Sequence, residues 1–92
     1  MKKRTAEKRV RITNKVGLHI RPASLLVETA QKFKSKIWIE KDGRKVDGKS
    51  VTSLLLISAE KGSEINIKAE GVDAPEAVKT LVNIVKNKFG EE

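Results

Sequence analysis

The sequence predicts an α+β fold in which three helices pack on one face of a sheet rich in antiparallel strands. Short segments with alternating apolar residues, typical of half-buried strands, are interspersed with segments that carry apolar residues on one helical face. Their order is strand, helix, strand, strand, helix, strand, helix. A chain of 92 residues forms one domain with a modest core. A single sheet with all helices on one face would bury the apolar faces of the three helices.

A short turn separates the first strand from the first helix. Val10 and Ile12 alternate with arginines, which predicts a half-buried strand. The sequence Asn-Lys-Val-Gly at 14–17 is typical of a turn. From Ala23 onward, apolar residues recur at the spacing of one helix face, so we expect a helix that Phe33 closes against the core.

The middle of the chain contains a predicted hairpin and a short helix. Ile37 and Ile39 alternate with polar or half-polar neighbours and predict a strand. Lys-Asp-Gly at 41–43 is a strong turn signal, and Val46 belongs to a short return strand. The apolar residues within 51–55 then indicate a short helix.

The last strand and the last helix follow. Apolar residues alternate over 65–69 and predict a strand. Asp73 with Glu76 three residues later is a capping-box signature, and the intervening proline suits a first helical turn. Apolar residues over 78–85 form one helical face, and Gly90 is expected to end this helix.

Composition restricts the classes of site that the chain can carry. The absence of cysteine excludes a disulfide framework and thiol chemistry, and a single histidine leaves too few ligands for a typical metal site. The first residues lack the apolar stretch of a signal peptide, and no run is long enough to cross a membrane. We therefore expect a cytoplasmic protein with no membrane insertion.

Positive charge dominates the chain and is concentrated near its start. The net charge is +8, and many of the lysines and arginines fall within residues 2–11. Residues 1–9 are interpreted as a basic N-terminal arm that precedes a single domain over 10–92. A basic balance favours an acidic protein face or nucleic acid as partner. Two phenylalanines and one tryptophan supply few stacking aromatics, so nucleic-acid binding is the weaker alternative.

Residues 43–50, GRKVDGKS, match the pattern of a phosphate-binding P-loop at every position. A strand before the loop and a helix after it would suit a nucleotide-binding protein. However, the predicted hairpin would return the chain to a second strand before the helix. No aspartate ends an apolar run to hold Mg²⁺, and the chain is short for a parallel sheet covered on both faces. The match is interpreted as a turn.

The single histidine lies where the first helix is predicted to begin. Because Pro22 suits a first helical turn, His19 falls at or near the N-cap and Arg21 in the first turn. A helix N-terminus usually favours Asp or Glu, whereas a cationic side chain beside free N–H groups favours a bound phosphate. A neutral imidazole can attack phosphorus, and Arg21 could then hold the phosphoryl oxygens. A surface histidine without a role is the alternative.

Residues 17–23, Gly-Leu-His-Ile-Arg-Pro-Ala, resemble the active-site motif of HPr, the histidine-containing phosphocarrier family of the bacterial sugar phosphotransferase system. The likeness extends from about residue 10 to residue 90. It implies an open-faced β-sandwich of βαββαβα order, with a four-stranded antiparallel sheet and three helices on one face. It also implies a monomeric phosphoryl carrier that is not an enzyme and that needs no cofactor.

The resemblance also implies partners and site residues. Enzyme I is phosphorylated by phosphoenolpyruvate, and His19 would accept the phosphoryl group from it at Nδ1. His19 would then pass the group to a IIA protein or domain for sugar uptake. Arg21 would stabilise the phosphate. Four residues are candidates for contact with partner proteins, although the last two could equally belong to the core: Ile20, Ser24, Leu54 and Leu55.

A second part of the resemblance concerns Ser50. Residues 48–51, Gly-Lys-Ser-Val, resemble the family signature that begins its second helix. The serine of that signature is a regulatory site for HPr kinase in many Gram-positive members, although Ser50 is also a plausible helix N-cap. Ile20 replaces the usual alanine, and Ser53 stands where many members have glycine. These departures leave a specialised regulatory paralogue as an alternative to a general carrier.

Overall fold

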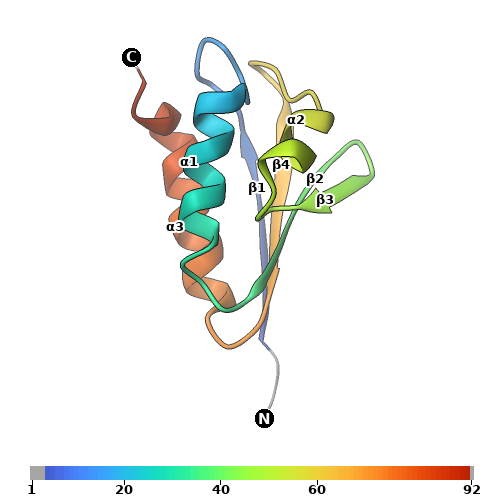
Figure 1. Ribbon diagram of the computed structural model, residues 1–92, viewed down its shortest axis with the longest axis vertical. Coiled ribbons are helices and arrows are strands. Elements are labelled where there is room, and N and C mark those ends of the chain that lie inside the picture. The colour runs from blue at the N-terminus through green and yellow to red at the C-terminus, as the bar shows by residue number, and fades with distance from the viewer. Residues whose placement is uncertain (1–3, 92) are drawn as a thin grey trace.

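The computed structural model describes residues 4–91 and has the predicted order of strands and helices (Figure 1). A short 3-10 turn, η1, follows the last helix. The strands are β1 Thr5–Arg11, β2 Lys36–Lys41, β3 Arg44–Asp47 and β4 Glu64–Glu70. The helices are α1 Ile20–Ala30, α2 Val51–Leu56 and α3 Ala74–Lys86, and η1 covers Lys88–Gly90.

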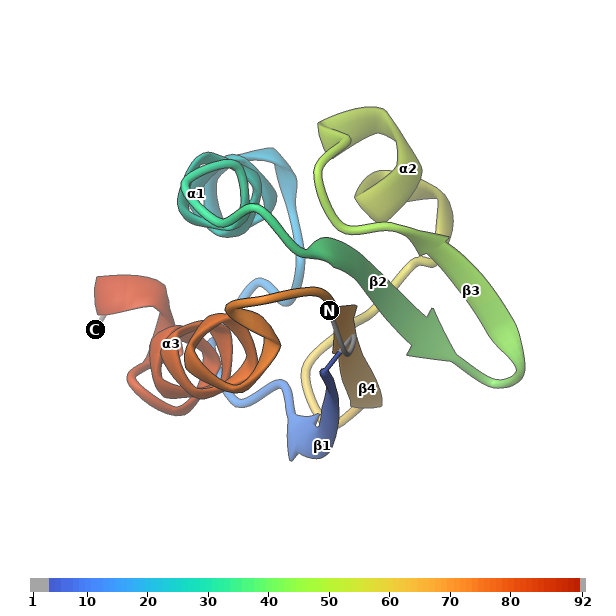
Figure 2. The same ribbon diagram turned by 90° about the horizontal axis from the view of Figure 1, so that it is seen from below.

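The four strands form one antiparallel sheet in the order β1-β4-β2-β3. The three helices cover one face of this sheet and leave the other face open, as Figure 2 shows. Alternation along β4 explains the arrangement, because Ile65, Ile67 and Ala69 are buried while the residues between them are partly exposed. The predicted α+β class and the open-faced sandwich are confirmed.

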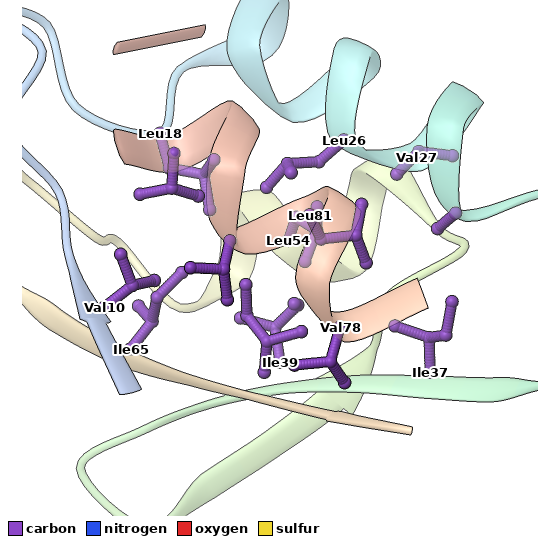
Figure 3. Packing of buried hydrophobic residues seen from close by; sticks show 14 of the residues in the cluster. Val10, Leu18, Leu26, Val27, Ile37, Ile39, Leu54, Ile65, Val78 and Leu81 are labelled. Atoms are coloured by element: carbon purple, nitrogen blue, oxygen red, sulfur yellow. The ribbon is translucent and has the colours of Figure 1, made fainter. Parts of the chain in front are cut away.

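The core lies between the sheet and the helices (Figure 3). Side chains from β2 and β4 meet those of the three helices there, and Leu54 and Ile67 have no exposed surface. Burial of one such aliphatic side chain contributes about 1.5–3 kcal/mol. The apolar residues predicted to form the inner face of α3, Val78, Leu81 and Val85, are all buried.

The first strand begins earlier than the sequence predicts. Residues 5–11 all pair with β4, from Thr5 opposite Glu70 to Arg11 opposite Glu64. The expected boundary between an arm over 1–9 and a domain that starts at residue 10 is therefore too late, and residues 1–3 lie outside the described residues. β1 is an edge strand, where charged side chains are tolerated, so its charge concealed the strand pattern.

The glycine that begins the P-loop match lies in the β2–β3 hairpin. Asp42 and Gly43 have φ of 51° and 82°, as the two loop residues of a type I′ turn require. Lys41 and Arg44 pair on either side of them. The segment 43–50 thus runs from a hairpin turn through a strand into α2, which is not the geometry of a phosphate-binding loop.

Asp73 is the N-cap residue of α3, but its carboxylate does not cap the helix. Instead it accepts hydrogen bonds from Ser35 Oγ at 2.5 Å, from the Ser35 N–H at 2.9 Å and from the Lys34 N–H at 2.9 Å. These hydrogen bonds lower the pKa of Asp73 from 3.8 to about 2, and the bond from the Ser35 hydroxyl contributes most, before that from the Lys34 amide. The predicted capping box is therefore replaced by a tie between the α1–β2 loop and α3.

The last helix ends before the predicted glycine. α3 stops at Lys86, and the chain then turns through Lys88 and Phe89, which have φ of 56° and 58°. Phe89 is buried, with 6% of its surface exposed, so its packing holds a backbone conformation that side chains disfavour. Gly90 lies at the end of this turn rather than at the end of α3.

Candidate functional site

His19 begins α1, as predicted, and its side chain takes no part in holding the fold. It is the N-cap residue, with φ of −76° and ψ of −177°, and its imidazole is exposed and makes no capping hydrogen bond. The Ala23 N–H donates to the His19 carbonyl at 2.9 Å. Pro22 has no N–H, so the first turn leaves the amides of Ile20 and Arg21 without helical acceptors. An anion beside His19 would meet these amides and the positive end of the helix.

Arg21 supplies positive charge next to the imidazole. It is exposed in the first turn of α1, which contains no acidic residue. Within residues 4–91, the guanidinium forms no hydrogen bond or ion pair. Its N–H donors are thus available for oxygens of a phosphoryl group on His19, a match that guanidinium geometry suits well.

The turn before His19 is held by close backbone contacts. The Leu18 N–H donates to the Ala59 carbonyl at 2.8 Å, and the Gly17 N–H donates to the Asn14 carbonyl at 3.3 Å. Gly17 has φ of 72°, and a Cβ there would lie 2.8 Å from the Ala59 carbonyl oxygen. Only glycine allows the backbone to come this close to Ala59, so the turn fixes the position of His19 and the start of α1.

An apolar surface adjoins the imidazole. A groove of about 510 Å³ is lined by His19 and Ile20 from the start of α1 and by Leu55 near the end of α2. Ile20 is 66% exposed and Leu55 is 39% exposed. Leu56 is also exposed, at 56%, and is a candidate contact that the sequence analysis missed.

Leu54 does not belong to this surface. It has no exposed area and packs in the core, so its prediction as a partner contact is wrong and its alternative as a core residue is confirmed. A helix of six residues shows too little periodicity for sequence alone to separate its inner face from its outer one. Ser24 lies in the second turn of α1 and is half-buried.

Ser50 lies at the start of α2, apart from the groove. Its hydroxyl oxygen accepts a hydrogen bond from the Ser53 N–H at 3.2 Å, which confirms the predicted N-cap. The neighbouring Lys49 N–H donates to Asp47 Oδ1 at 2.9 Å and shapes the entry to the helix. Ser50 is partly exposed and is not among the residues that line the groove beside His19.

Comparison with known proteins explains this arrangement. Residues 6–87 match a family model described as the PTS HPr component phosphorylation site. The chain belongs to the HPr family. HPr proteins are phosphocarriers of the phosphotransferase system, so the exposed histidine at a helix N-terminus lies in a fold that carries phosphoryl groups.

Relatives cover nearly all of the chain. The phosphocarrier protein HPr of Neisseria meningitidis serogroup A is 38% identical over 89% of this chain and 92% of its own. The HPr-like protein Crh of Halalkalibacterium halodurans is 42% identical over 87% and 95%. A crystal structure of HPr from Thermoanaerobacter tengcongensis has a TM-score of 0.91 and 47% identity over 95% and 98%. Another from that organism, described as a dimer, has a TM-score of 0.76 and 48% identity over 89% and 94%.

Two further features of the described residues bear on the site. No helix within 4–91 is long and apolar enough to span a membrane. The same residues contain no cluster of three or more histidine, cysteine, aspartate or glutamate side chains that could hold a metal ion.

Proposed function

We propose that this member of the HPr family is a phosphoryl carrier in which His19 accepts the phosphoryl group of enzyme I and transfers it to a IIA protein. The position of His19 carries the proposal, because its imidazole is exposed at the N-terminus of α1 and has no structural partner within the described residues. The lone pair of Nδ1 attacks phosphorus, the bond to enzyme I breaks, and a phosphorus–nitrogen bond forms on His19. In the second transfer an acceptor group of the IIA protein attacks phosphorus, the phosphorus–nitrogen bond breaks, and the imidazole of His19 is released.

Arg21 and the start of α1 are proposed to stabilise the transferred group. The incoming phosphoryl oxygens are negative, and the guanidinium two residues along can donate charge-assisted hydrogen bonds to them. The unbonded amides of the first helical turn add further donors. These groups are in place before the reaction, so little rearrangement is needed when the charge arrives.

Partner proteins are proposed to dock on the apolar surface beside the imidazole. Ile20 and Leu55 expose aliphatic side chains there, and Ser24 lies on the adjoining turn of α1. Leu56, the next residue of α2, is also exposed. An apolar centre would exclude water around the phosphoryl group during transfer. The net charge of +8 favours partners with an acidic face and would speed their encounter. We propose that these encounters take place in the cytoplasm, with this chain as a monomer.

Regulation through Ser50 is a second proposal. A phosphate on Ser50 would sit at the N-terminus of α2, where a negative charge is compatible with the helix. It would add negative charge at the start of α2, the helix whose other end carries Leu55 and Leu56, and HPr kinase is the proposed donor. The likeness to Crh supports a regulatory paralogue as the second candidate function. The exposed His19 beside Arg21 favours the carrier, because a role through Ser50 alone needs neither.

Binding of nucleic acid finds little support in the fold. Phe33 and Phe89 pack against the core. Trp38 alternates with the buried Ile37 and Ile39, so it alone of the three aromatic residues lies on the open face of the sheet. One ring is a poor platform for stacking successive bases.

A relay experiment tests the carrier function. Purified chain is incubated with phosphoenolpyruvate and a catalytic amount of enzyme I, the phosphoenolpyruvate is removed, and a IIA protein is added in equal amount. We expect phosphate to appear first on this chain and then to move to the IIA protein. Phosphate that stays on the chain when the IIA protein is added would contradict the carrier function and favour the regulatory paralogue. Gel filtration of the purified chain alone tests whether the chain is a monomer.

A further inference from the structure

Asn14 occupies an unusual position at the base of the turn that leads to His19. It has no exposed surface. Its Nδ2 donates to the Gly17 carbonyl at 2.8 Å and to Glu91 Oε1 at 3.0 Å. Its Oδ1 is the one buried side-chain oxygen or nitrogen without a partner in the part of the chain that the structure describes. The two acceptors fix the orientation of the amide. In a flipped amide the side-chain oxygen, which cannot donate a hydrogen bond, would face both acceptors.

The chain after α3 adopts a conformation that brings Glu91 to this amide. Lys88, Phe89 and Gly90 have φ of 56°, 58° and 75° in succession. Such left-handed backbone is unfavourable for residues with side chains and persists where surrounding contacts enforce it. Burial of Phe89 and the Glu91 N–H bond to the Lys88 carbonyl, at 2.9 Å, supply those contacts. Figure 1 shows this segment at the same end of the molecule as the loop before α1.

We propose that Glu91 is a positioning residue for the reaction at His19 and that it acts through Asn14. The inference rests on the carrier function proposed above. The chain of contacts runs from the Glu91 carboxylate to the Asn14 amide and on to the Gly17 carbonyl, two residues before His19. The carboxylate makes the first of these a charge-assisted hydrogen bond, which is stronger than a neutral one.

Loss of the carboxylate would disturb the turn because the Asn14 side chain would keep only its hydrogen bond to the Gly17 carbonyl. Asn14 Oδ1 is already unpaired, so without Glu91 the buried side chain would keep one hydrogen bond of those it can form. It would then reorient to recover partners and would release the Gly17 carbonyl. The Leu18 N–H, bonded to the Ala59 carbonyl, lies in the same turn and reports its order. A small displacement of His19 slows transfer, since reacting atoms must meet in a narrow geometry.

The test compares Glu91→Ala, Glu91→Gln and the charge-matched control Glu76→Gln. Glu76 is exposed in the first turn of α3, and that end of α3 lies far from the start of α1 (Figure 1). Each protein is phosphorylated by phosphoramidate, a small donor that needs no docking surface, and separately by enzyme I. We expect Glu91→Ala to slow both reactions on the order of tenfold. Glu91→Gln should stay near wild type, because its amide oxygen can accept from Asn14.

Amide hydrogen exchange and circular dichroism on the same proteins separate positioning from general stability. In Glu91→Ala we expect faster exchange at Leu18 while the protein remains folded at the assay temperature. Wild-type rates in Glu91→Ala would overturn the inference alone, as would a slowing matched by partial unfolding. A wild-type chain that accepts phosphate from neither donor would overturn the carrier function as well, and this outcome is distinguishable because no variant is involved.

Discussion

At the scale of single residues, the proposed site consists of side chains that form no hydrogen bond or ion pair within the described part of the fold. His19 and Arg21 are exposed, and within residues 4–91 neither side chain forms a hydrogen bond or an ion pair. Their replacement should therefore change phosphoryl transfer without changing stability. Residues kept at a local electrostatic cost are expected where function requires them.

Replacement of Arg21 tests the proposed stabilisation of the phosphoryl group. We expect Arg21→Ala to slow phosphorylation by enzyme I by roughly 10²–10³-fold, the usual cost of removing one preorganised donor. Arg21→Lys should recover part of this loss, because lysine keeps the charge but not the paired donors. Rapid-quench time courses measure the rates, and thermal unfolding should show the same midpoint for all three proteins. An unchanged rate in Arg21→Ala would remove Arg21 from the site.

Local sequence was enough to predict some of these residues but not others. The positions of His19 and Ser50 at helix starts follow from local sequence, because a helix N-cap is encoded within a few neighbouring residues. The exposure of Leu56 and the burial of Leu54 depend on how a short helix rotates against the sheet, which local sequence does not encode. The contact between Asn14 and Glu91 joins residues 77 positions apart, so it became visible only in the folded chain.

At the scale of secondary-structure elements, the start of each helix has its own chemistry. α1 begins at His19 without a side-chain cap, α2 is capped by the Ser50 hydroxyl, and the Asp73 carboxylate at the start of α3 turns to a neighbouring loop. The uncapped helix is the one beside the proposed acceptor. The side chains at the starts of α2 and α3 thus form hydrogen bonds within the fold, and the side chain at the start of α1 is left for the proposed transfer.

The cap of α2 can be tested by substitution. Ser50→Ala should lower the free energy of unfolding by about 1 kcal/mol, since it removes the acceptor for the Ser53 amide. Ser50→Asp keeps an acceptor and should stay within a few tenths of wild type. Urea denaturation followed by Trp38 fluorescence gives both values. Equal loss in the two variants would indicate that the hydroxyl matters for another reason.

The tie at Asp73 predicts a dependence of stability on pH. Its pKa falls from 3.8 in the unfolded chain to about 2 in the fold, so the ionised carboxylate stabilises the fold above the higher value. This stabilisation is lost as the pH falls through about 4 toward about 2. Asp73→Asn should make the thermal midpoint depend less on pH over this window. Asp42→Asn, at an exposed turn, should leave the pH dependence of the midpoint unchanged. The same acid sensitivity in wild type and Asp73→Asn would refute the tie.

Element order followed from sequence, and two element ends did not. β1 begins at Thr5 because pairing with β4 overrides the charge of its side chains. α3 ends at Lys86 because burial of Phe89 bends the chain before Gly90. In both cases a contact distant in sequence decides where the element stops, and a local pattern cannot encode it.

At the scale of the whole molecule, the helices lie on one side of the sheet and its open face on the other (Figure 2). The apolar groove is lined by residues at the start of α1 and near the end of α2. Charges on the open face are partly paired, as in the contacts of Lys68 with Glu40 at 3.3 Å and of Arg9 with Glu64 at 3.5 Å. The net charge of +8 nevertheless leaves a positive field around the molecule. This field is proposed to guide acidic partners toward the chain.

Ionic strength should therefore control association more than dissociation. We expect the association rate with enzyme I to fall several-fold as ionic strength rises from about 0.01 to about 0.15 M, because the screening length shortens from about 30 to about 8 Å. The dissociation rate should change little, since apolar contacts dominate the bound state. Stopped-flow binding measures both rates. An association rate independent of salt would exclude steering by the net charge.

The central claim is that His19 is the phosphoryl acceptor, and direct mapping of the phosphate tests it most simply. The chain is incubated with phosphoenolpyruvate and a cognate, active enzyme I, and intact mass is recorded for wild type, His19→Ala and Ser50→Ala. We predict a single acid-labile phosphate on wild type and Ser50→Ala that is absent from His19→Ala. A phosphate that persists in His19→Ala, or none on wild type, would contradict the account.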